Sequence, residues 1–556
     1  MSVIEEKADK IECTDNELVS HHSISNHHKE EQVTWKMKTL VLLCLFSLPG
    51  KKNNTVYNLV LAYKIYIVGC HYLEATVGTL KTTLKQEMQI NNTQFSILLS
   101  SVTLVNTVLP LVAGSLIDDA HSIGSVRSTF IVSIIILLGS ILVSIGATIS
   151  SYSCMMTGQI IYGLGGGMIV TMQEGLISRW FRDKEVTIII GVMLSIARLT
   201  KWVAKMVAYP IYNATGSYAS SIHIATMFCA LGALANSIYW FVLWQKGWAT
   251  VTGREVQSNK SSLHYKKKQP FKWSYSVLLH IPGIFWMVPL VQLVMSSVLS
   301  SFDDVATEYI EFRYDTDFVL AGYQSSLTQV VPIVVAPILG ILVHKYGQRL
   351  TILFFATIIL LVSMVLLSYT WVTPAVGMIL FSLALALGPV SLLSSTSLLL
   401  PHELSGTGMG LHKCANNIGT TIVSVLVGYV QDLTYHDGDP DDDNYDLQNE
   451  YTGVMIFYLF LAVLSIFIAA TFWLLDRFVL RSWLQINKAE REKRLDQCVD
   501  ACEKEQKETS LKYVGMQLRD KKKYIYVVFF LFWLLVSWAV FFTFALMPIY
   551  ENYSLK

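Results

Sequence analysis

Charged residues are scarce in this chain. Asp, Glu, Lys and Arg make up 15% of its 556 residues and hydrophobic residues make up 53%, whereas a soluble domain averages roughly 25% charged residues. The mean hydropathy is +0.46. Apolar runs of about 20 residues, the length that crosses a hydrocarbon core of about 30 Å as a helix, recur along the sequence. These features exclude an ordinary soluble domain and predict a polytopic all-α membrane protein.

Cysteine pairs and catalytic motifs are also missing. The eight cysteines include no CxxC pair and no zinc spacing, and Cys498 and Cys502, four residues apart, are weak grounds for a metal site. The sequence has no nucleophile elbow, no HExxH and no glycine-rich phosphate loop followed by lysine. The glycines of "GLGGG" (163–167) lie in an apolar segment, where small residues serve helix packing. We therefore expect neither an enzyme nor a bound metal or cofactor.

Hydrophobic runs divide the chain into membrane spans. After a first span, we expect helices near 92–117, 128–149, 153–178, 186–209, 218–244, 281–302, 319–343, 350–370, 372–398, 406–432 and 451–476. The expected organisation is a disordered cytosolic tail (1–36), a six-helix bundle (37–245), a basic cytosolic loop (246–280), a second six-helix bundle (281–476), a charged cytosolic helical segment (477–523) and an extra transmembrane helix (524–549).

Charge and sequons predict the orientation. The loop between the sixth and seventh spans is rich in Lys and Arg, whereas "HDGDPDDDNYD" (436–446) on the opposite side is strongly acidic. The positive-inside rule then places the N-terminus in the cytosol. The sequons at Asn91 and Asn213 fall in non-cytosolic loops, and the one at Asn259 is cytosolic and so unused.

The first span is irregular. "KTLVLLCLFSLPG" (38–50) is followed by the polar stretch 51–64, and apolar character returns at Ile65. Joining Gly50 to Ile65 would give one ordinary span, so 51–64 is either an insert from a gene-model error or a real extra loop. The helix at 524–549 is open to the same two interpretations.

Two segments resemble each other across the two bundles. "GSLIDDAHSIGSVR" (114–127) ends the second span and "GILVHKYGQR" (340–349) ends the eighth. Such a repeat implies two six-helix halves, as in transporters that bind substrate between repeats. The pattern resembles the loop signature of the major facilitator superfamily, although the first copy is three residues longer and His344 stands where an acid is usual.

This resemblance implies a cytosolic gate built from charged residues that pair with helix ends. The expected gate residues are Asp118, Arg127, Glu174, Arg179, His344 and Arg349.

A narrower resemblance lies in the fourth, fifth and eleventh spans. "TGQIIYGLGGG" (157–167), Gln173, "WF" (180–181), "KE" (184–185), Gly191, "ARL" (197–199) and "GTGMGLHKCANNIGTTIVSVLVGYVQD" (406–432) are similar to the family of major facilitator superfamily domain-containing protein 1. Thr200 departs from the glycine usual after Arg-Leu. The likeness covers roughly 37–476 without the insert 51–64, and neither the tails nor the helix at 524–549. It implies a lysosomal dipeptide exporter, by uniport or with a proton, and a single-span glycoprotein accessory subunit.

Three cations lie inside the fifth span. An ionisable side chain at the bilayer centre costs about 2.5–3.5 kcal/mol on insertion scales, yet Arg198, Lys201 and Lys205 fall on one helical stripe there. We expect the stripe to face a water-filled substrate path, with Arg198 holding a carboxylate through two parallel hydrogen bonds. The alternatives are a structural bridge from Arg198 to an acid and a Lys205 side chain that snorkels to the interface.

Acids and amides complete the expected substrate site. Glu74 in the first span, or an acid of the seventh, would hold an amine. Asp303, Asp304 and Glu308, placed at the end of the seventh span, are expected instead to form a solvated rim. The amides Asn416, Asn417 and Gln292 are expected to hydrogen-bond a peptide group or to join helices, and Gln329 and Tyr323 are weaker candidates.

Together these patterns predict an alternating-access secondary transporter of dipeptides in a lysosomal or vacuolar membrane, with the plasma membrane as an alternative. Two other functions remain open. A monocarboxylate or other organic-anion transporter would use Arg198 and Lys201 without an acid, and a non-transporting nutrient sensor could use the same fold.

Overall fold

The computed structural model describes residues 68–118, 125–180, 186–245, 278–279, 281–400, 404–434, 449–487, 489–491, 493–494 and 524–554. All of them belong to one compact unit, residues 59–556. The expected tail (1–36), the insert (51–64), the acidic loop (436–446), and most of the basic loop and of the charged segment lie outside these ranges.

The first half contains the first six spans. Residues 68–79 are helical. They are followed by α3 (Lys81–Met88), α4 (Asn92–Val105), α5 (Leu109–Asp118), α6 (Ser125–Thr148), α7 (Tyr152–Trp180), α8 (Val186–Thr215) and α9 (Ala219–Gln245). The start of α4 follows from its sequence, because the Asn91 side chain accepts a hydrogen bond from the Gln94 backbone while the Gln94 side chain bonds back to Asn91.

The second half repeats this pattern. Its seventh span joins the short helices η2 (Gly283–Trp286) and α11 (Met287–Val291), one π-turn, η3 (Gln292–Ser296), and α12 (Ser297–Tyr314). The later spans are α13 (Phe318–Ser326) with η4 (Leu327–Gln329) and α14 (Val330–Tyr346), then α15 (Arg349–Tyr369), α16 (Pro374–Leu399), α17 (Ser405–Thr434) and α19 (Thr452–Val479). Nine helical stretches among the described residues are long and apolar enough to cross a membrane.

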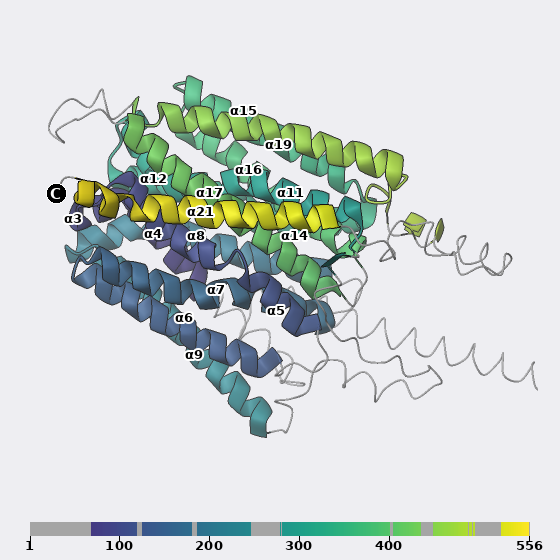
Figure 1. The fold of residues 1–556 in the computed structure, drawn as a ribbon, viewed down its shortest axis with the longest axis horizontal. Helices are drawn as coiled ribbons and strands as arrows, with labels where there is room; N and C mark the ends of the chain where they lie inside the picture. Colours follow the sequence, from purple (N-terminus) through teal and green to yellow (C-terminus); the bar gives the residue numbers. More distant parts are fainter. Residues whose placement is uncertain are drawn as a thin grey trace, which may run out of the picture. The chain divides into compact units, whose positions relative to one another are not determined.

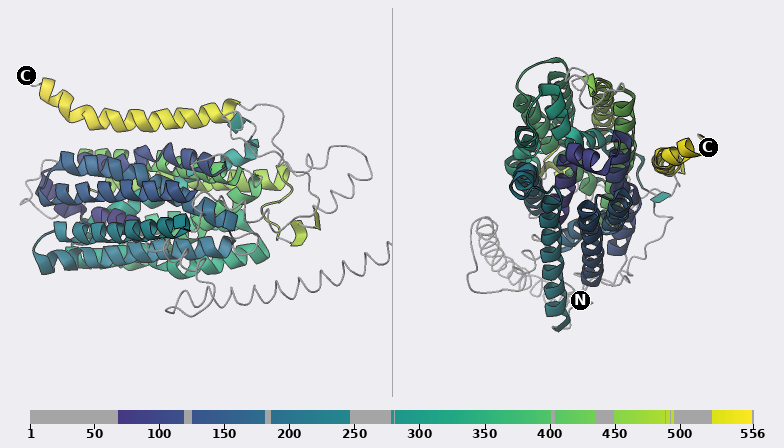
Figure 2. Two further views of the ribbon diagram at one scale, coloured as in Figure 1. Left: turned by 90° about the horizontal axis from the view of Figure 1, so that it is seen from below. Right: turned by 90° about the vertical axis from the view of Figure 1, so that its left-hand side faces the viewer.

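The two halves meet along pairs of helices that the repeat relates. The second span (α4 and α5) packs on the eleventh (α17), and the eighth (α13 and α14) packs on the fifth (α8). The helices of both halves follow one common direction (Figure 2). Gly410 allows a close approach, since a Cβ there would lie 2.6 Å from the Pro110 carbonyl oxygen. Helix α3 also contacts α12.

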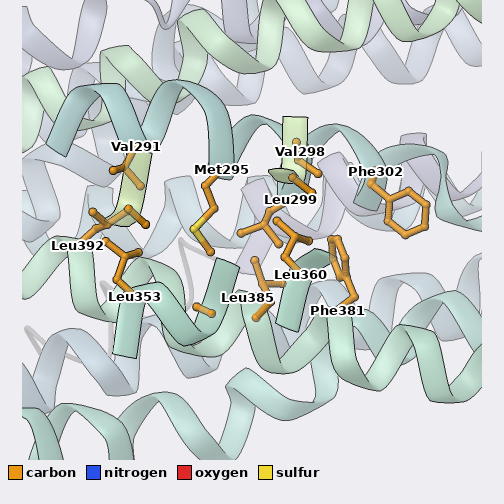
Figure 3. Close-up of a cluster of buried hydrophobic side chains, with 14 of the residues drawn as sticks. Val291, Met295, Val298, Leu299, Phe302, Leu353, Leu360, Phe381, Leu385 and Leu392 are labelled. Atoms are coloured by element: carbon orange, nitrogen blue, oxygen red, sulfur yellow. The ribbon is translucent and has the colours of Figure 1, made fainter. Parts of the chain in front are cut away.

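Each half has its own apolar core. In the second half, Met295, Leu299 and Phe302 of the seventh span lie against α15 and α16, where Leu360 and Phe381 face them (Figure 3). All five side chains are at most 2% exposed, and burying an apolar side chain of this size stabilises the fold by about 1.5–3 kcal/mol. The first half has a separate cluster of buried apolar residues, all of them from its own helices.

Helix α21 (Tyr524–Ser554) covers the extra span expected at 524–549. It contacts α17 and α4, one helix from each half (Figure 1). The Trp538 indole Nε1 donates a hydrogen bond to Thr107 Oγ1 at 3.0 Å, and Phe541 packs with Leu104 and Val425.

Candidate functional site

The cations of α8 meet acids from both halves. Lys201 Nζ lies 3.2 Å from Glu74 Oε2, and the two side chains are 18% and 35% exposed. His71 Nδ1 lies 3.4 Å from the same Glu74 oxygen. Two predicted substrate residues, Lys201 and Glu74, are therefore brought together, but as partners of each other.

Lys205 is buried and paired. Its Nζ donates to Asp303 Oδ1 at 2.8 Å and to the Asp303 carbonyl at 2.7 Å. Thr328 Oγ1 and Gln329 Nε2 each donate to the same carboxylate oxygen at 2.7 Å. Since Lys205 is 2% exposed, the alternative that it snorkels to the interface is wrong. The α12 acid supplies the counter-charge that makes burial tolerable.

Arg198 differs from the two lysines. Its Nη1 donates to Gln329 Oε1 at 3.1 Å, and no acid lies within ion-pair distance of it in the described part of the chain. Gln329 connects the guanidinium indirectly to Asp303. The alternative of a structural bridge from Arg198 to an acid is thus not formed with any described residue, which leaves most of the five N–H donors for another group.

The seventh span does not end where its hydropathy falls. Helix α12 continues to Tyr314, and Asp303 and Glu308 within it are 6% and 1% exposed. The expectation that these two acids form a solvated rim is wrong, because buried lysines from the first half neutralise them. Asp304 is half-buried and makes no hydrogen bond or ion pair with any described residue.

A second ionic network surrounds Glu308. Lys81 Nζ lies 2.5 Å from Glu308 Oε2 and Lys85 Nζ lies 2.8 Å from Oε1. The Tyr451 hydroxyl and Gln431 Nε2 donate to Glu308 Oε2 at 2.5 and 3.1 Å, and Lys81 also donates to Gln431 Oε1 at 2.7 Å. The glutamate therefore has two cations and two neutral donors around it.

Polar contacts continue from this network across the halves. Asn92 Nδ2 and Gln431 Nε2 donate to Glu450 Oε1 at 3.1 and 2.5 Å. The backbone N–H groups of Asn92 and Thr93 donate to the Asp432 carboxylate at 3.0 and 2.8 Å. Burial raises the pKa of Glu450, which precedes α19. We name the end of the molecule that holds the Glu308 network and these contacts the ion-paired end.

Lys81 and Lys85 were not predicted as functional residues, because charged residues at the end of a span ordinarily reach water. A partial signal exists, because Lys81 and Lys85 lie four residues apart at the end of the first span. Residues at this spacing share a helix face. Only the knowledge that the first and seventh spans touch would have paired both lysines with Glu308.

Amides at the centre of the second half join helices. Gln292 Nε2 and His412 Nε2 lie 2.5 Å apart. Ser296 donates a hydrogen bond to Gln292 Oε1, and both of these residues belong to the π-turn. Such turns are frequent at functional sites. Asn417 Nδ2 donates to the Asn106 carbonyl of the other half at 2.9 Å. Asn416 is half-buried. His412 was not predicted.

Most of the expected gate residues lie outside the described part of the structure. This applies to the side chains of Asp118, Arg127, Glu174, Arg179 and His344. Arg349 is 4% exposed, and its Nη1 donates at 3.3 Å to the carbonyl of Leu484 in the segment that follows α19. Its role in a gate between the halves stays a prediction.

Comparisons with known proteins agree with this architecture. The sequence model of the Major Facilitator Superfamily matches residues 67–424. The lysosomal dipeptide transporter MFSD1 of Homo sapiens is 22% identical over 366 residues, 66% of this chain and 77% of the relative. The protein of the same name in Danio rerio is 23% identical over 383 residues, 67% of this chain and 80% of the relative.

Solved structures show the same fold. A D-xylose-proton symporter superposes with a TM-score of 0.55 at 13% identity, over 75% of this chain and 98% of its own. A point mutant of the nucleoside transporter NupG superposes with a TM-score of 0.52 at 13% identity, over 76% of this chain and 100% of its own. The predicted all-helical transporter fold is confirmed, and the relatives are transporters, not enzymes. The chain belongs to the Major Facilitator Superfamily of membrane transporters.

Proposed function

We propose that this protein carries dipeptides across the membrane of a lysosome- or vacuole-like compartment by alternating access. One observation carries the proposal: the Arg198 guanidinium lies inside a membrane span, where α8 meets the second half, and has an amide rather than an acid as its described partner. A fixed cation at this place suits a substrate carboxylate, because its planar fork can form two parallel hydrogen bonds.

The ion-paired end supports the alternating-access part of the proposal. If the basic loop is cytosolic, this end faces the lumen. Lys81 and Lys85 of the first half hold Glu308 of the second half there, so this conformation is sealed toward the lumen. Two halves with separate cores can rock only if these pairs break and re-form, and buried pairs with two discrete arrangements suit such a switch.

The relatives named lysosomal dipeptide transporter MFSD1 support the choice of dipeptide and of compartment. Export toward the cytosol, by uniport or with a proton, and the association with a single-span accessory subunit are parts of the same proposal. Uptake into proteoliposomes with and without an imposed pH gradient separates uniport from proton symport.

The first test is a thermal-shift screen of the purified protein against dipeptides, amino acids, sugars and carboxylates. A ligand of the folded state stabilises it by RT ln(1 + [L]/Kd), about 2.7 kcal/mol at a hundredfold excess over Kd. We expect dipeptides to raise the melting temperature of the wild type and to lose this effect in Arg198→Ala. Retention of the full shift in Arg198→Ala would remove Arg198 from the site.

Arg198→Lys is the matched variant, because it keeps the charge but not the fork. We expect it to bind dipeptide more weakly than the wild type and more tightly than Arg198→Ala. A melting temperature without ligand close to that of the wild type shows that both variants fold. If dipeptides bind but are not carried into sealed proteoliposomes, the protein is a nutrient sensor and not a transporter.

The organic-anion alternative requires Lys201 as a second free cation. Lys201 is already bound to Glu74, so an anion would have to displace that carboxylate. Competition decides between the two functions: a monocarboxylate that competes as well as a dipeptide would favour the anion transporter.

A further inference from the structure

The charges between α8, residues 68–79 and α12 do not pair completely. Three cations and three acids face this interface: Arg198, Lys201, Lys205, Glu74, Asp303 and Asp304. Lys201 pairs with Glu74 and Lys205 pairs with Asp303. One cation, Arg198, and one acid, Asp304, remain without an ionic partner among the described residues.

The carboxylate of Asp304 is placed against the first span. Its Oδ1 lies 3.6 Å from the position that a Cβ on Gly78 would occupy, and its backbone oxygen lies 3.2 Å from that position. Gly78 is one helical turn after Glu74, on the same helix face. Asp304 therefore faces the interface between the halves, beside the Lys201–Glu74 pair, and not the core of its own half.

The cations that act on Asp304 are already taken. The positive charges near Asp304 are Lys201 and Lys205. Its negative neighbours are Asp303 and Glu74, and the Tyr458 side chain of α19 also lies near it. Each lysine is closer to another carboxylate. A carboxylate in this position lacks a counter-charge, and a buried or half-buried charge favours an ion that supplies one.

We propose that Asp304 binds the α-ammonium group of the substrate whose carboxylate meets Arg198. This inference rests on the proposed dipeptide transport. A zwitterion brings one negative and one positive end, and so supplies both missing partners at once. The transporter then requires a free amino terminus. Of the two candidates predicted from the sequence for this role, Glu74 and an acid of the seventh span, Glu74 serves as the partner of Lys201.

The test compares two ligands on the full-length protein in proteoliposomes. Competition with a labelled dipeptide is measured for Ala-Ala and for N-acetyl-Ala-Ala, which lacks the ammonium group. For the wild type we expect N-acetyl-Ala-Ala to compete about 30-fold or more weakly, the effect of losing one partner of a desolvated charge pair. In Asp304→Asn we expect Ala-Ala to weaken by a similar factor while N-acetyl-Ala-Ala is unchanged.

Asp304→Glu keeps the charge and should retain the preference for Ala-Ala. Asp315→Asn is the matched control, because Asp315 is an exposed carboxylate at the end of the same helix, with φ +48°, a conformation that asparagine adopts readily. It should behave as the wild type.

The outcomes separate the two proposals. A wild type that binds Ala-Ala and N-acetyl-Ala-Ala equally, or an Asp304→Asn variant that keeps the preference, overturns the amine site and leaves dipeptide transport standing. The amine site at Asp304 is also overturned, and dipeptide transport still stands, if Glu74→Gln and not Asp304→Asn abolishes the preference for Ala-Ala over N-acetyl-Ala-Ala. A wild type that binds neither ligand overturns dipeptide transport, and the amine site with it.

Discussion

Lys205 and Asp303 show what allows a membrane span to hold a full charge. An isolated ammonium group in a low-dielectric medium would lose several kcal/mol of hydration, and the pair recovers this only with good geometry and further hydrogen bonds. Asp303 accepts from Lys205, Thr328 and Gln329. The pair is therefore a structural connection between α8 and the second half, and Gln329 links it to Arg198, the residue proposed to bind substrate.

Removing only the lysine should be costly. We expect Lys205→Met to lower the free energy of unfolding by about 3–5 kcal/mol, because Asp303 is left buried without a cation. The double variant Lys205→Met/Asp303→Asn should recover much of this loss. Unfolding of the detergent-solubilised protein measures both.

Lys345→Met is the control for that cycle, since Lys345 is exposed at the end of α14 and should change stability little. A double variant as unstable as Lys205→Met would show that neutralising Asp303 brings no recovery, and would contradict the view that an uncompensated buried carboxylate causes the loss.

At the residue scale the sequence predicted positions but not partners. The spacing of Arg198, Lys201 and Lys205 places them on one stripe of a helix. Their partners are distant along the chain: Gln329 is 131 residues from Arg198 and Asp303 is 98 residues from Lys205. No local pattern specifies which side chain arrives from that distance, so the sequence left the substrate and structural roles of these cations open.

At the scale of single helices, hydropathy predicted most elements closely. The expected span at 350–370 is α15 (Arg349–Tyr369), and that at 406–432 is α17 (Ser405–Thr434). The seventh span was cut short at 302, because Asp303, Asp304 and Glu308 lower the local hydropathy. The helix continues since two of these acids find buried cations on neighbouring helices, which a window along one segment cannot detect.

The ion-paired end should behave as a gate. Glu308→Gln removes the counter-charge of Lys81 and Lys85, which disfavours the sealed conformation in which Lys81 is buried. A loss of even about 1.4 kcal/mol changes the ratio of open to sealed molecules tenfold. Ser96 is 3% exposed and lies against Gly428 of α17. We expect a cysteine at this position to react with a maleimide about tenfold faster or more in Glu308→Gln than in the protein with Glu308.

The measurement uses a background in which the eight native cysteines are replaced by alanine. Glu87→Gln, the same substitution at an exposed site of α3, serves as the control and should leave the rate unchanged. Equal rates in the two variants, with unchanged melting temperatures, would show that Glu308 does not hold the gate.

For the whole molecule, the repeat decides how the halves meet. The second span packs on the eleventh and the eighth on the fifth, an arrangement in which each half contributes the equivalent pair of helices. The short segments at 114–127 and 340–349 predicted these halves, but not which helices would touch. Rocking along these two contacts would expose the Arg198 region first to one end and then to the other.

The orientation is a further prediction for the whole molecule. Ser217, between α8 and α9, lies at the ion-paired end. Its neighbour Tyr218 contacts Ser150, and Tyr152, two residues after Ser150, donates a hydrogen bond to the Gln94 carbonyl. Gln94 is in the first turn of α4, which begins in the polar network of that end. Lys345 lies at the opposite end. Cysteines at Ser217 and Lys345 both start from exposed positions, so access from each side of the membrane decides their labelling.

In sealed microsomes with the cytosolic face outward, we expect a membrane-impermeant maleimide to label Lys345→Cys directly. Ser217→Cys should be labelled only after the membrane is permeabilised. The reverse pattern would place the ion-paired end in the cytosol, and these ion pairs would then seal the molecule toward the cytosol instead of toward the lumen. Because export requires the lumenal end to open before substrate binds, that result would also reverse the step at which Glu308 acts.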